Sequence, residues 1–358
     1  MPKRSTMIDW DLAVATAVKM SGQGPAIPRE EALEVVAELR AGATRSTPLV
    51  REFTGLVAPE GEARTAPVLV VDRTGWIQAN VDGFAEVISP LVDKLQQRRR
   101  KPSPLTDVVG SRVTGVELGA LLGFMSSKVL GQFDPFYAPA GSRDAGRLLL
   151  VAPNIVQVEE QLAVDPTDFR LWVCLHEETH RVQFTAVPWL RDHIHGEIAN
   201  LVGSVEVDPA RLAALVGDGV RRLSDVIRGE DDVSLLDLVQ SPEQKIVLDR
   251  ITGVMSLLEG HADVVMDGVG PDVIPTVRDI RRKFNQRRKS AGTLDRLLRR
   301  LLGFEAKMAQ YRNGAAFVRS AVDAVGMDGF NRVWAEPANL PSKSEIGDPV
   351  SWVRRVHG

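Results

Sequence analysis

The segment RLWVCLHEETHRVQF, residues 170–184, contains His176, Glu177 and His180 in the order H-E-x-x-H. Residues four apart on an α-helix lie on one face, so both histidines can bind the same metal ion. Zinc favours imidazole nitrogen, and a catalytic zinc site leaves one position open beside three protein ligands. Glu177 lies next to the pair and could accept a proton from a water molecule there. The spacing therefore predicts a zinc site with a carboxylate base.

The third ligand is not evident from this segment. The extended motif H-E-x-x-H-x-x-G-x-x-H is absent, because Gln183 and Ala186 occupy the positions of its glycine and its third histidine. This argues against a metzincin. Two downstream glutamates are the candidates, Glu197 in HIHGEIAN and Glu259 in LLEGHADVVMD.

Of these two glutamates we favour Glu259. Asp263 lies four residues after it, on the same face of a helix. A metal-binding histidine needs a partner for its other ring N–H, and the Asp263 carboxylate could supply one. Leu201 has the same position relative to Glu197 and cannot do this. Glu259 is thus the predicted third ligand, with Asp263 orienting one of the histidines.

Three other polar residues bear on the site. His261 should point away from a metal held by Glu259, but it could line the pocket and donate to an oxyanion; a buried structural histidine is the alternative. Tyr311 could donate in the same way, or simply pack in the core. Glu178 argues against the metal hypothesis, because zinc-peptidase helices usually have an uncharged residue at this position.

The elements that must position these residues are mostly helical. Apolar residues at helical spacing predict helices within 28–43, 83–100, 115–133 and 237–267, in addition to the motif helix. Short apolar runs predict strands at 66–72 and 147–153, with a further candidate at 76–80. We therefore expect an α+β fold, mostly α, in one domain over 1–358. Its N-terminal part, about 1–165, would hold the small sheet, and its helical part, about 166–358, would hold the metal site.

Composition narrows the class of protein. The chain has 358 residues and a net charge of −3, so no global field draws it to nucleic acid or to a membrane. Its one cysteine, Cys174, fits a reducing compartment. The N-terminal segment 1–22 has acidic residues within its apolar run and predicts an amphipathic helix rather than a signal peptide. No segment has the ~18–20 apolar residues of a membrane span. We expect a cytoplasmic protein.

Two basic segments suggest a function of another class. Residues 278–303 contain ten Lys or Arg, and QQRRRK follows the same pattern at 96–101. Such clusters can neutralise phosphates. Few aromatic residues lie between these cations, so we interpret them as solvated helix faces and do not expect nucleic-acid binding. A catalytically inactive zincin-like protein that binds nucleic acid or a protein partner through these helices remains the alternative hypothesis.

The chain resembles a zincin-like family of zinc-dependent metalloproteases or hydrolases found mainly in actinobacteria. Some members carry a label that associates them with biosynthesis of the deazaflavin coenzyme. The resemblance extends over roughly residues 10–355. The segments that carry it are HEETHRVQFTAVPWLRDHI, LLEGHADVVMD, GFMSSKVLGQFDPF, VAPNI, LGFEAKMAQYRNGAAFV and GFNRVWAEPANLPSKSEIGDP.

This resemblance implies a zincin-like fold, with a small sheet, an active-site helix and a largely helical remainder. It implies that His176 and His180 bind Zn²⁺ and that Glu177 is the base, and it favours Glu259 as third ligand. The spacing of Glu259 and Asp263 resembles the gluzincin arrangement. We therefore expect a zinc-dependent metallopeptidase acting on a peptide or another amide. The substrate and the oligomeric state do not follow from the sequence.

Overall fold

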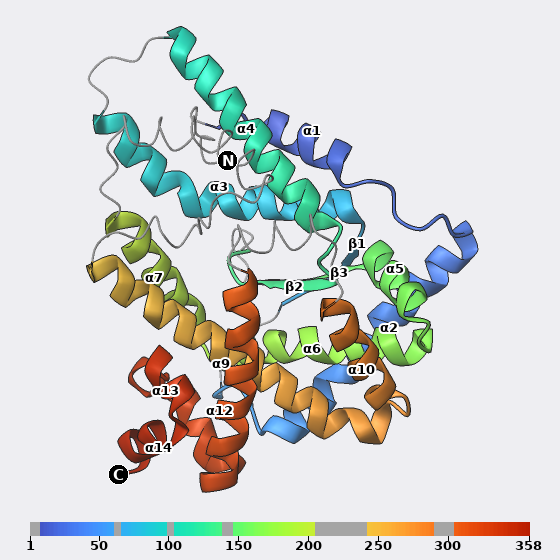
Figure 1. The fold of residues 1–358 in the computed structure, drawn as a ribbon, viewed down its shortest axis with the longest axis vertical. Coiled ribbons are helices and arrows are strands. Elements are labelled where there is room, and N and C mark those ends of the chain that lie inside the picture. Colours follow the sequence, from blue (N-terminus) through green and yellow to red (C-terminus); the bar gives the residue numbers. More distant parts are fainter. Residues whose placement is uncertain (1–7, 61–65, 99–103, 138–145, 205–241, 290–303) are drawn as a thin grey trace.

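The computed structural model describes residues 8–60, 66–98, 104–137, 146–204, 242–289 and 304–358 (Figure 1). The helices are α1 (Trp10–Met20), α2 (Arg29–Thr54), α3 (Arg73–Arg98), α4 (Pro104–Ser126), α5 (Ala152–Leu162), α6 (Pro166–Ala186), α7 (Leu190–Ser204), α9 (Pro242–Val273), α10 (Val277–Lys289), α12 (Phe304–Phe330), α13 (Lys343–Gly347) and α14 (Pro349–His357). Two 3₁₀ turns, η2 (Asn331–Trp334) and η3 (Pro337–Asn339), precede α13. The strands are β1 (Val68–Val71), β2 (Gly131–Asp134) and β3 (Arg147–Val151).

The sheet has three strands in the order β1-β3-β2. The central strand β3 pairs in parallel with β1 and antiparallel with β2, with Leu150 opposite both Val70 and Gly131. Residues 148–151 of β3 are fully buried, as expected for an apolar strand covered on both faces. The mostly helical α+β fold predicted from the sequence is confirmed.

The expected strands at 66–72 and 147–153 are present as β1 and β3. The expected strand at 76–80 is wrong, because these residues lie in the first turns of α3. Asp72 accepts a hydrogen bond from the backbone N–H of Gly75 at 2.7 Å, which is the contact of a helix N-cap. Trp76 and Ile77 are buried there in a second small core with α1. A five-residue window was too short to distinguish this helix from a strand.

The prediction of one helix over 115–133 is also wrong at its C-terminal end. α4 ends at Ser126, and β2 begins at Gly131. β2 exists because β3 supplies hydrogen-bonding partners for it, and such long-range pairing leaves no mark in local periodicity. The helices expected at 28–43 and 83–100 are present as α2 and α3, both longer than predicted.

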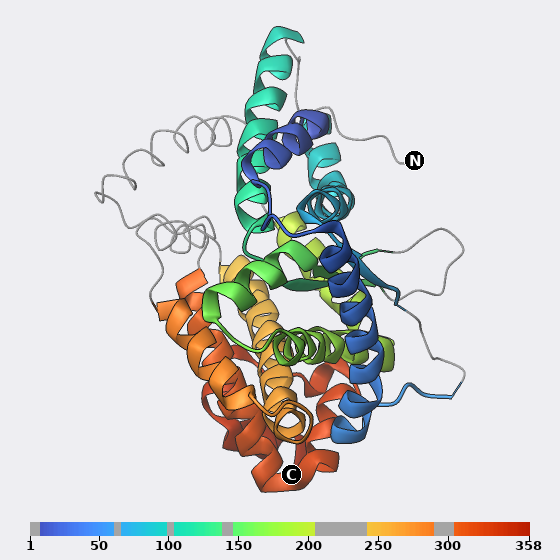
Figure 2. The same cartoon turned by 90° about the vertical axis from the view of Figure 1, so that its right-hand side faces the viewer.

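The motif helix α6 lies between the sheet and the C-terminal helices (Figures 1 and 2). Asp165 caps it by accepting from the N–H of Asp168, and Pro166 occupies its first turn, as helix starts favour. It ends at Ala186, two residues before Pro188. The Asp168 carboxylate also accepts from the N–H and hydroxyl of Thr276, at 2.9 and 2.5 Å, just before α10. This contact joins the start of α6 to the connection between α9 and α10.

β2 packs on α6 with one face and on α3 with the other. Phe133 stacks on Phe184 of α6, with ring centroids 4.9 Å apart. Gln132, on the opposite face, donates to the side-chain oxygen of Asn80 in α3 at 3.0 Å. Since side chains of a strand alternate between faces, Gly131 points towards α6 together with Phe133. Among the described residues, no helix is long and apolar enough to cross a bilayer.

α9 crosses α6 and packs along α12, the long red helix of Figure 1. The two helix backbones approach closely at Gly260 and Gly314. A Cβ atom added at Gly260 would lie 2.1 Å from the carbonyl carbon of Gly314, so only glycine permits this distance. Gly260 follows Glu259 in sequence, and the contact therefore helps to position that residue.

Replacement of Gly260 by Ala is expected to lower the free energy of unfolding by about 3 kcal/mol, because overpacking here involves backbone rather than a flexible side chain. Gly196→Ala in α7 is the matched control. No atom lies within 4 Å of the added Cβ there, and Ala should stabilise that helix by about 0.5–1 kcal/mol. Urea denaturation of both variants measures the difference. Equal effects would contradict the proposed packing.

Candidate metal centre

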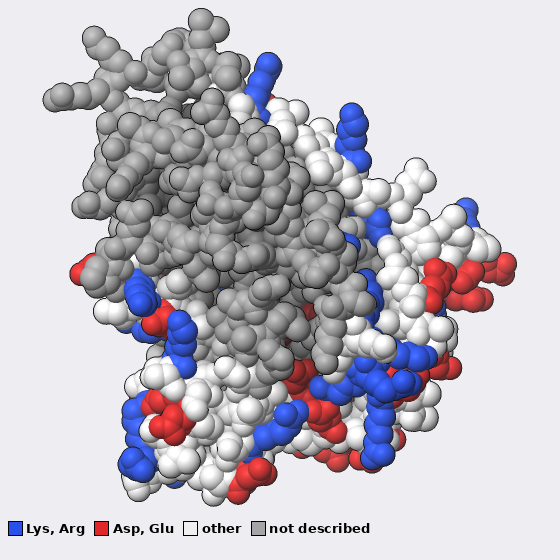
Figure 3. Space-filling view, in the orientation of Figure 1, with Lys and Arg blue, Asp and Glu red and all other residues white. Residues whose placement is uncertain are grey.

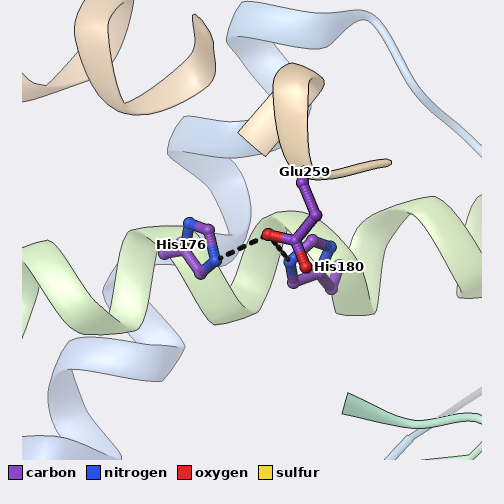
Figure 4. Close-up of side chains that lie close together, drawn as sticks. All are labelled: His176, His180 and Glu259. Atoms are coloured by element: carbon purple, nitrogen blue, oxygen red, sulfur yellow. Dashed lines mark ion pairs between the residues drawn. The ribbon is translucent and has the colours of Figure 1, made fainter. Parts of the chain in front are cut away.

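The side chains of His176, His180 and Glu259 meet between α6 and α9 (Figure 4). The Glu259 Oε2 atom lies 3.5 Å from Nε2 of His176 and 3.7 Å from Nε2 of His180. The two imidazole rings are nearly perpendicular, with centroids 4.9 Å apart. Figure 4 shows the carboxylate descending from α9 between both rings of α6. Among the described residues, this is the one group of three His, Cys, Asp or Glu side chains that lie close enough together to hold a metal ion.

The geometry of the three groups fits zinc. With metal–ligand bonds of about 2.0–2.1 Å in a tetrahedron, neighbouring ligand atoms lie about 3.3 Å apart. The distances of 3.5 and 3.7 Å are near this value. Two imidazoles and one carboxylate form a common ligand set of catalytic zinc sites. The side chain of His176 is 27% exposed, so the centre is accessible from solvent.

In the metal-free site, electrostatic interactions favour a protonated His180 paired with an ionised Glu259. Burial acts to lower the pKa of His180, but the nearby Glu259 carboxylate, with a smaller effect of Glu177, raises it to about 9. Burial acts to raise the pKa of Glu259, yet the two histidines hold it well below its usual range. An imidazolium–carboxylate pair thus occupies the site before metal binds, and zinc must displace the His180 proton.

This pair predicts a pH-dependent stability for the metal-free protein. Because the folded-state pKa of His180 lies above its unfolded value of 6.5, its contribution is fully present below pH 6.5 and is lost as the pH rises through 9. We expect the free energy of unfolding to fall by up to about 3 kcal/mol over this range. Urea denaturation with a chelator present tests this, and His180→Gln should lack the decrease. An identical decrease in both proteins would refute the assignment to His180.

Glu177 points to the sheet side of α6 and is 7% exposed. A Cβ atom added at Gly131 of β2 would lie 2.5 Å from Cγ and Cδ of Glu177, so the absent side chain of Gly131 makes room for this carboxylate. Burial raises the pKa of Glu177, and the neighbouring His176 and His180 side chains act in the opposite direction. A carboxylate whose pKa is raised is a stronger base, as general base catalysis requires.

Glu178 does not disturb the centre, although its charge argued against the metal hypothesis in the sequence. It is fully buried on another side of α6. Its carboxylate accepts from Arg181, at 2.8 and 3.0 Å, and from the hydroxyl of Thr47 in α2, at 3.0 Å. These contacts offset the desolvation cost of burying the Glu178 charge. Glu178 therefore links α6 to α2, away from the metal ligands.

The sequence analysis predicted Asp263 as the partner of a histidine ring N–H, but other side chains lie at the Nδ1 atoms of both histidines. His180 Nδ1 lies 3.0 Å from Oε1 of Gln183. His176 Nδ1 lies 3.2 Å from the sulfur of Met266. The carboxylate of Asp263 instead lies 3.6 Å from the guanidinium of Arg281 in α10. Asp263 lies four residues after Glu259 on α9, but a cation on the neighbouring helix α10 attracts its carboxylate.

The remaining candidates are placed as follows. Glu197 pairs with Arg250 at 2.9 Å and is not part of the centre. His261 is fully buried, with its ring stacked on Phe330. Burial lowers its pKa to about 3, with a smaller effect of His180. His261 is thus enclosed in the core and does not line an open pocket. Tyr311 lies in α12, at a position whose side chain is outside the described residues.

Sequence reasoning missed two residues of the centre. Gln183 was noted only because it replaces the metzincin glycine, yet it lies three residues after His180 on the same helix face. A polar residue between the apolar Val182 and Phe184 was the available signal. Gly131 was assigned to a helix, and nothing local indicated that it approaches Glu177.

Comparison with known proteins agrees with this centre. The family model of the zincin-like metallopeptidases matches residues 8–353. A crystal structure of a candidate hydrolase with a novel fold, from Chloroflexus aurantiacus, is similar at 31% sequence identity and a TM-score of 0.69, covering 97% of this chain and 98% of that one. A search of curated proteins finds no match. The matched family covers nearly the whole chain, including the three residues that converge between α6 and α9. The chain therefore belongs to the zincin-like metallopeptidase family.

Proposed function

We propose that this protein is a zinc-dependent peptidase of the gluzincin type. The observation that carries this proposal is the convergence of His176, His180 and Glu259 beside the buried Glu177 carboxylate. His176 and Glu259 lie 83 positions apart along the chain, and the fold brings their metal-binding atoms together with that of His180. Family membership and the similarity to a candidate hydrolase support the same class of reaction.

In this mechanism His176, His180 and Glu259 hold the metal. Zinc bound there would polarise the scissile carbonyl and lower the pKa of a water molecule. Glu177 accepts one proton from the attacking water as its oxygen adds to the carbonyl carbon. It then delivers that proton to the amide nitrogen as the C–N bond breaks. Burial suits Glu177 to both steps, because it strengthens the base and keeps bulk water away from its carboxylate.

The position of β2 supports an extended peptide as the substrate. β2 is one of the two edge strands of the sheet, and only β3 pairs with it among the described strands. Gly131 of β2 is in contact distance of Glu177. A peptide that added to the outer edge of β2 would carry its backbone carbonyls past the catalytic base, and such strand addition is a common mode of peptide recognition. Sequence-independent backbone contacts would then contribute much of the affinity.

The basic helix α10 gives little support to the alternative of a nucleic-acid-binding protein. Arg281 pairs with Asp263 and Asp267 of α9, and Lys283 pairs with Asp279. Figure 3 shows basic and acidic side chains intermixed on the part of this face that is not grey. Charges paired in this way release few counterions and bind phosphates weakly. The rest of the basic segment, 290–303, and residues 99–101 of the second cluster lie outside the described residues.

The test is the metal content of the purified protein together with its hydrolysis of a mixed peptide library. We expect about one zinc per chain and cleavage that a chelator abolishes and added zinc restores. The double variant His176→Ala, His180→Ala should lose both zinc and cleavage while keeping its helical circular dichroism. Wild-type protein that takes up no zinc, even after incubation with it, would refute the proposal.

A further inference from the structure

The Gln183 side chain lies in a buried hydrogen-bond network between α6 and α9. Its amide nitrogen lies 3.1 Å from the backbone oxygen of Leu258 and 2.9 Å from Nδ1 of His261. Its oxygen lies 3.0 Å from Nδ1 of His180. Gln183 and His261 are both fully buried, and Leu258 is 2% exposed. Water therefore does not compete for these contacts.

The network permits one arrangement of hydrogens. The Leu258 carbonyl can only accept, so its partner must be the amide N–H of Gln183. The Gln183 oxygen consequently faces His180, whose Nδ1 must carry the hydrogen. Once zinc displaces the second proton of His180, the lone pair is on Nε2, the atom that lies 3.7 Å from Oε2 of Glu259. The amide thus selects the form of His180 that can bind a metal.

His261 completes this arrangement. The second N–H of the Gln183 amide has His261 Nδ1 as its acceptor, so both amide hydrogens are used. The other ring nitrogen of His261, Nε2, has no hydrogen-bond partner among the described residues. The ring stacks on Phe330 and lies against Trp334, with centroids 5.7 and 5.4 Å apart. A buried unpaired ring nitrogen costs stability, and a phenyl ring would avoid this cost. Packing alone does not explain a histidine here.

We propose that Gln183 and His261 are positioning residues for the metal centre, with His261 fixing the Gln183 amide and the amide fixing the orientation and tautomer of His180. This inference rests on the proposed function, because it assumes that His180 binds zinc. A metal-binding histidine usually donates its other ring N–H to a carboxylate, a carbonyl or water. Here a side-chain amide on the same helix takes that role, three residues after the ligand.

The experiment measures zinc affinity by competition with a chelator, on the full chain. Gln183→Met removes both polar groups at similar length and should weaken zinc binding by about 10- to 100-fold. His261→Phe keeps the ring contacts and should weaken it by about three- to tenfold, the equivalent of one hydrogen bond. Thr179→Val is the matched control, since Thr179 is fully buried on α6 and donates only to the Leu175 carbonyl, at 2.8 Å. It should change zinc affinity less than twofold.

Two further readouts distinguish positioning from a structural role. The metal-free His261→Phe variant should unfold at about the same temperature as wild type, although it binds zinc more weakly. Removal of the unpaired Nε2 of His261 offsets the loss of the acceptor for the Gln183 amide N–H. In ¹⁵N-histidine NMR spectra of the zinc-loaded wild type, His180 should carry its proton on Nδ1, and this hydrogen-bonded signal should be lost in Gln183→Met. Folded Gln183→Met with wild-type zinc affinity would overturn the inference. If that variant does not fold, wild-type affinity in His261→Phe would overturn it.

The same data separate this inference from the proposed function. If wild type binds zinc but cleaves no peptide, and the two variants lose affinity as expected, the positioning roles stand and the peptidase assignment fails. If wild type binds no zinc, both fail. If wild type binds zinc and cleaves peptides while both variants retain full affinity, only the positioning roles fail.

Discussion

Glu177→Gln is expected to reduce peptide hydrolysis by about 10²- to 10⁴-fold, the usual contribution of a general base, and to leave the zinc content unchanged. The amide occupies the same space beside Gly131 as the carboxylate does, but it cannot accept a proton at neutral pH. The measurement is turnover of a cleaved peptide together with zinc analysis of the same preparation. Loss of zinc would mean that Glu177 acts as a ligand, and unchanged turnover would exclude it as the base.

Glu178→Gln provides the control for this experiment. Glu178 is the next residue on α6 and is more deeply buried, but its partners are Arg181 and Thr47 rather than the metal ligands. Removing its charge should lower the free energy of unfolding by about 1–2 kcal/mol and change turnover by less than about threefold. The pair of variants thus compares two adjacent buried carboxylates, of which only one faces the reaction.

Glu259→Gln is expected to weaken zinc binding by about 10³-fold. Zinc binding to a protein site has a free energy of about 10–16 kcal/mol, and one of three ligands contributes about a third of it. A neutral amide also no longer holds the positive charge of His180, so the pKa of His180 should fall from its raised value of about 9. Chelator competition measures the affinity, and NMR titration of the metal-free protein measures the pKa.

Glu197→Gln is the matched control for the third ligand. Glu197 was the other candidate in the sequence, and its carboxylate pairs with Arg250, whose side chain is half exposed. Such a pair contributes little to stability, so this variant should retain wild-type zinc affinity and unfold within about 0.5 kcal/mol of wild type. Weaker zinc binding in Glu197→Gln than in Glu259→Gln would place the third ligand on α7 instead of α9.

The sequence by itself determined the features that depend on a single helix. His176 and His180 share a face because helical periodicity is local, and no distant residue is needed to predict it. The same holds for the amphipathic N-terminal helix, which the structure contains as α1. The central strand β3 was evident because a run of four consecutive apolar residues is typical of a covered strand.

The tertiary structure decided which residues complete the centre. Glu197 and Glu259 were both compatible with local patterns, and only the crossing of α9 over α6 brings Glu259 to the histidines. Asp263 was the predicted partner of a histidine, but it pairs with Arg281 on α10, and Gln183 lies at Nδ1 of His180 instead. β2, with Gly131 beside Glu177, forms only because β3 pairs with it. These outcomes depend on contacts between segments far apart in the chain, and the competition among such contacts is settled by packing, which local periodicity does not encode.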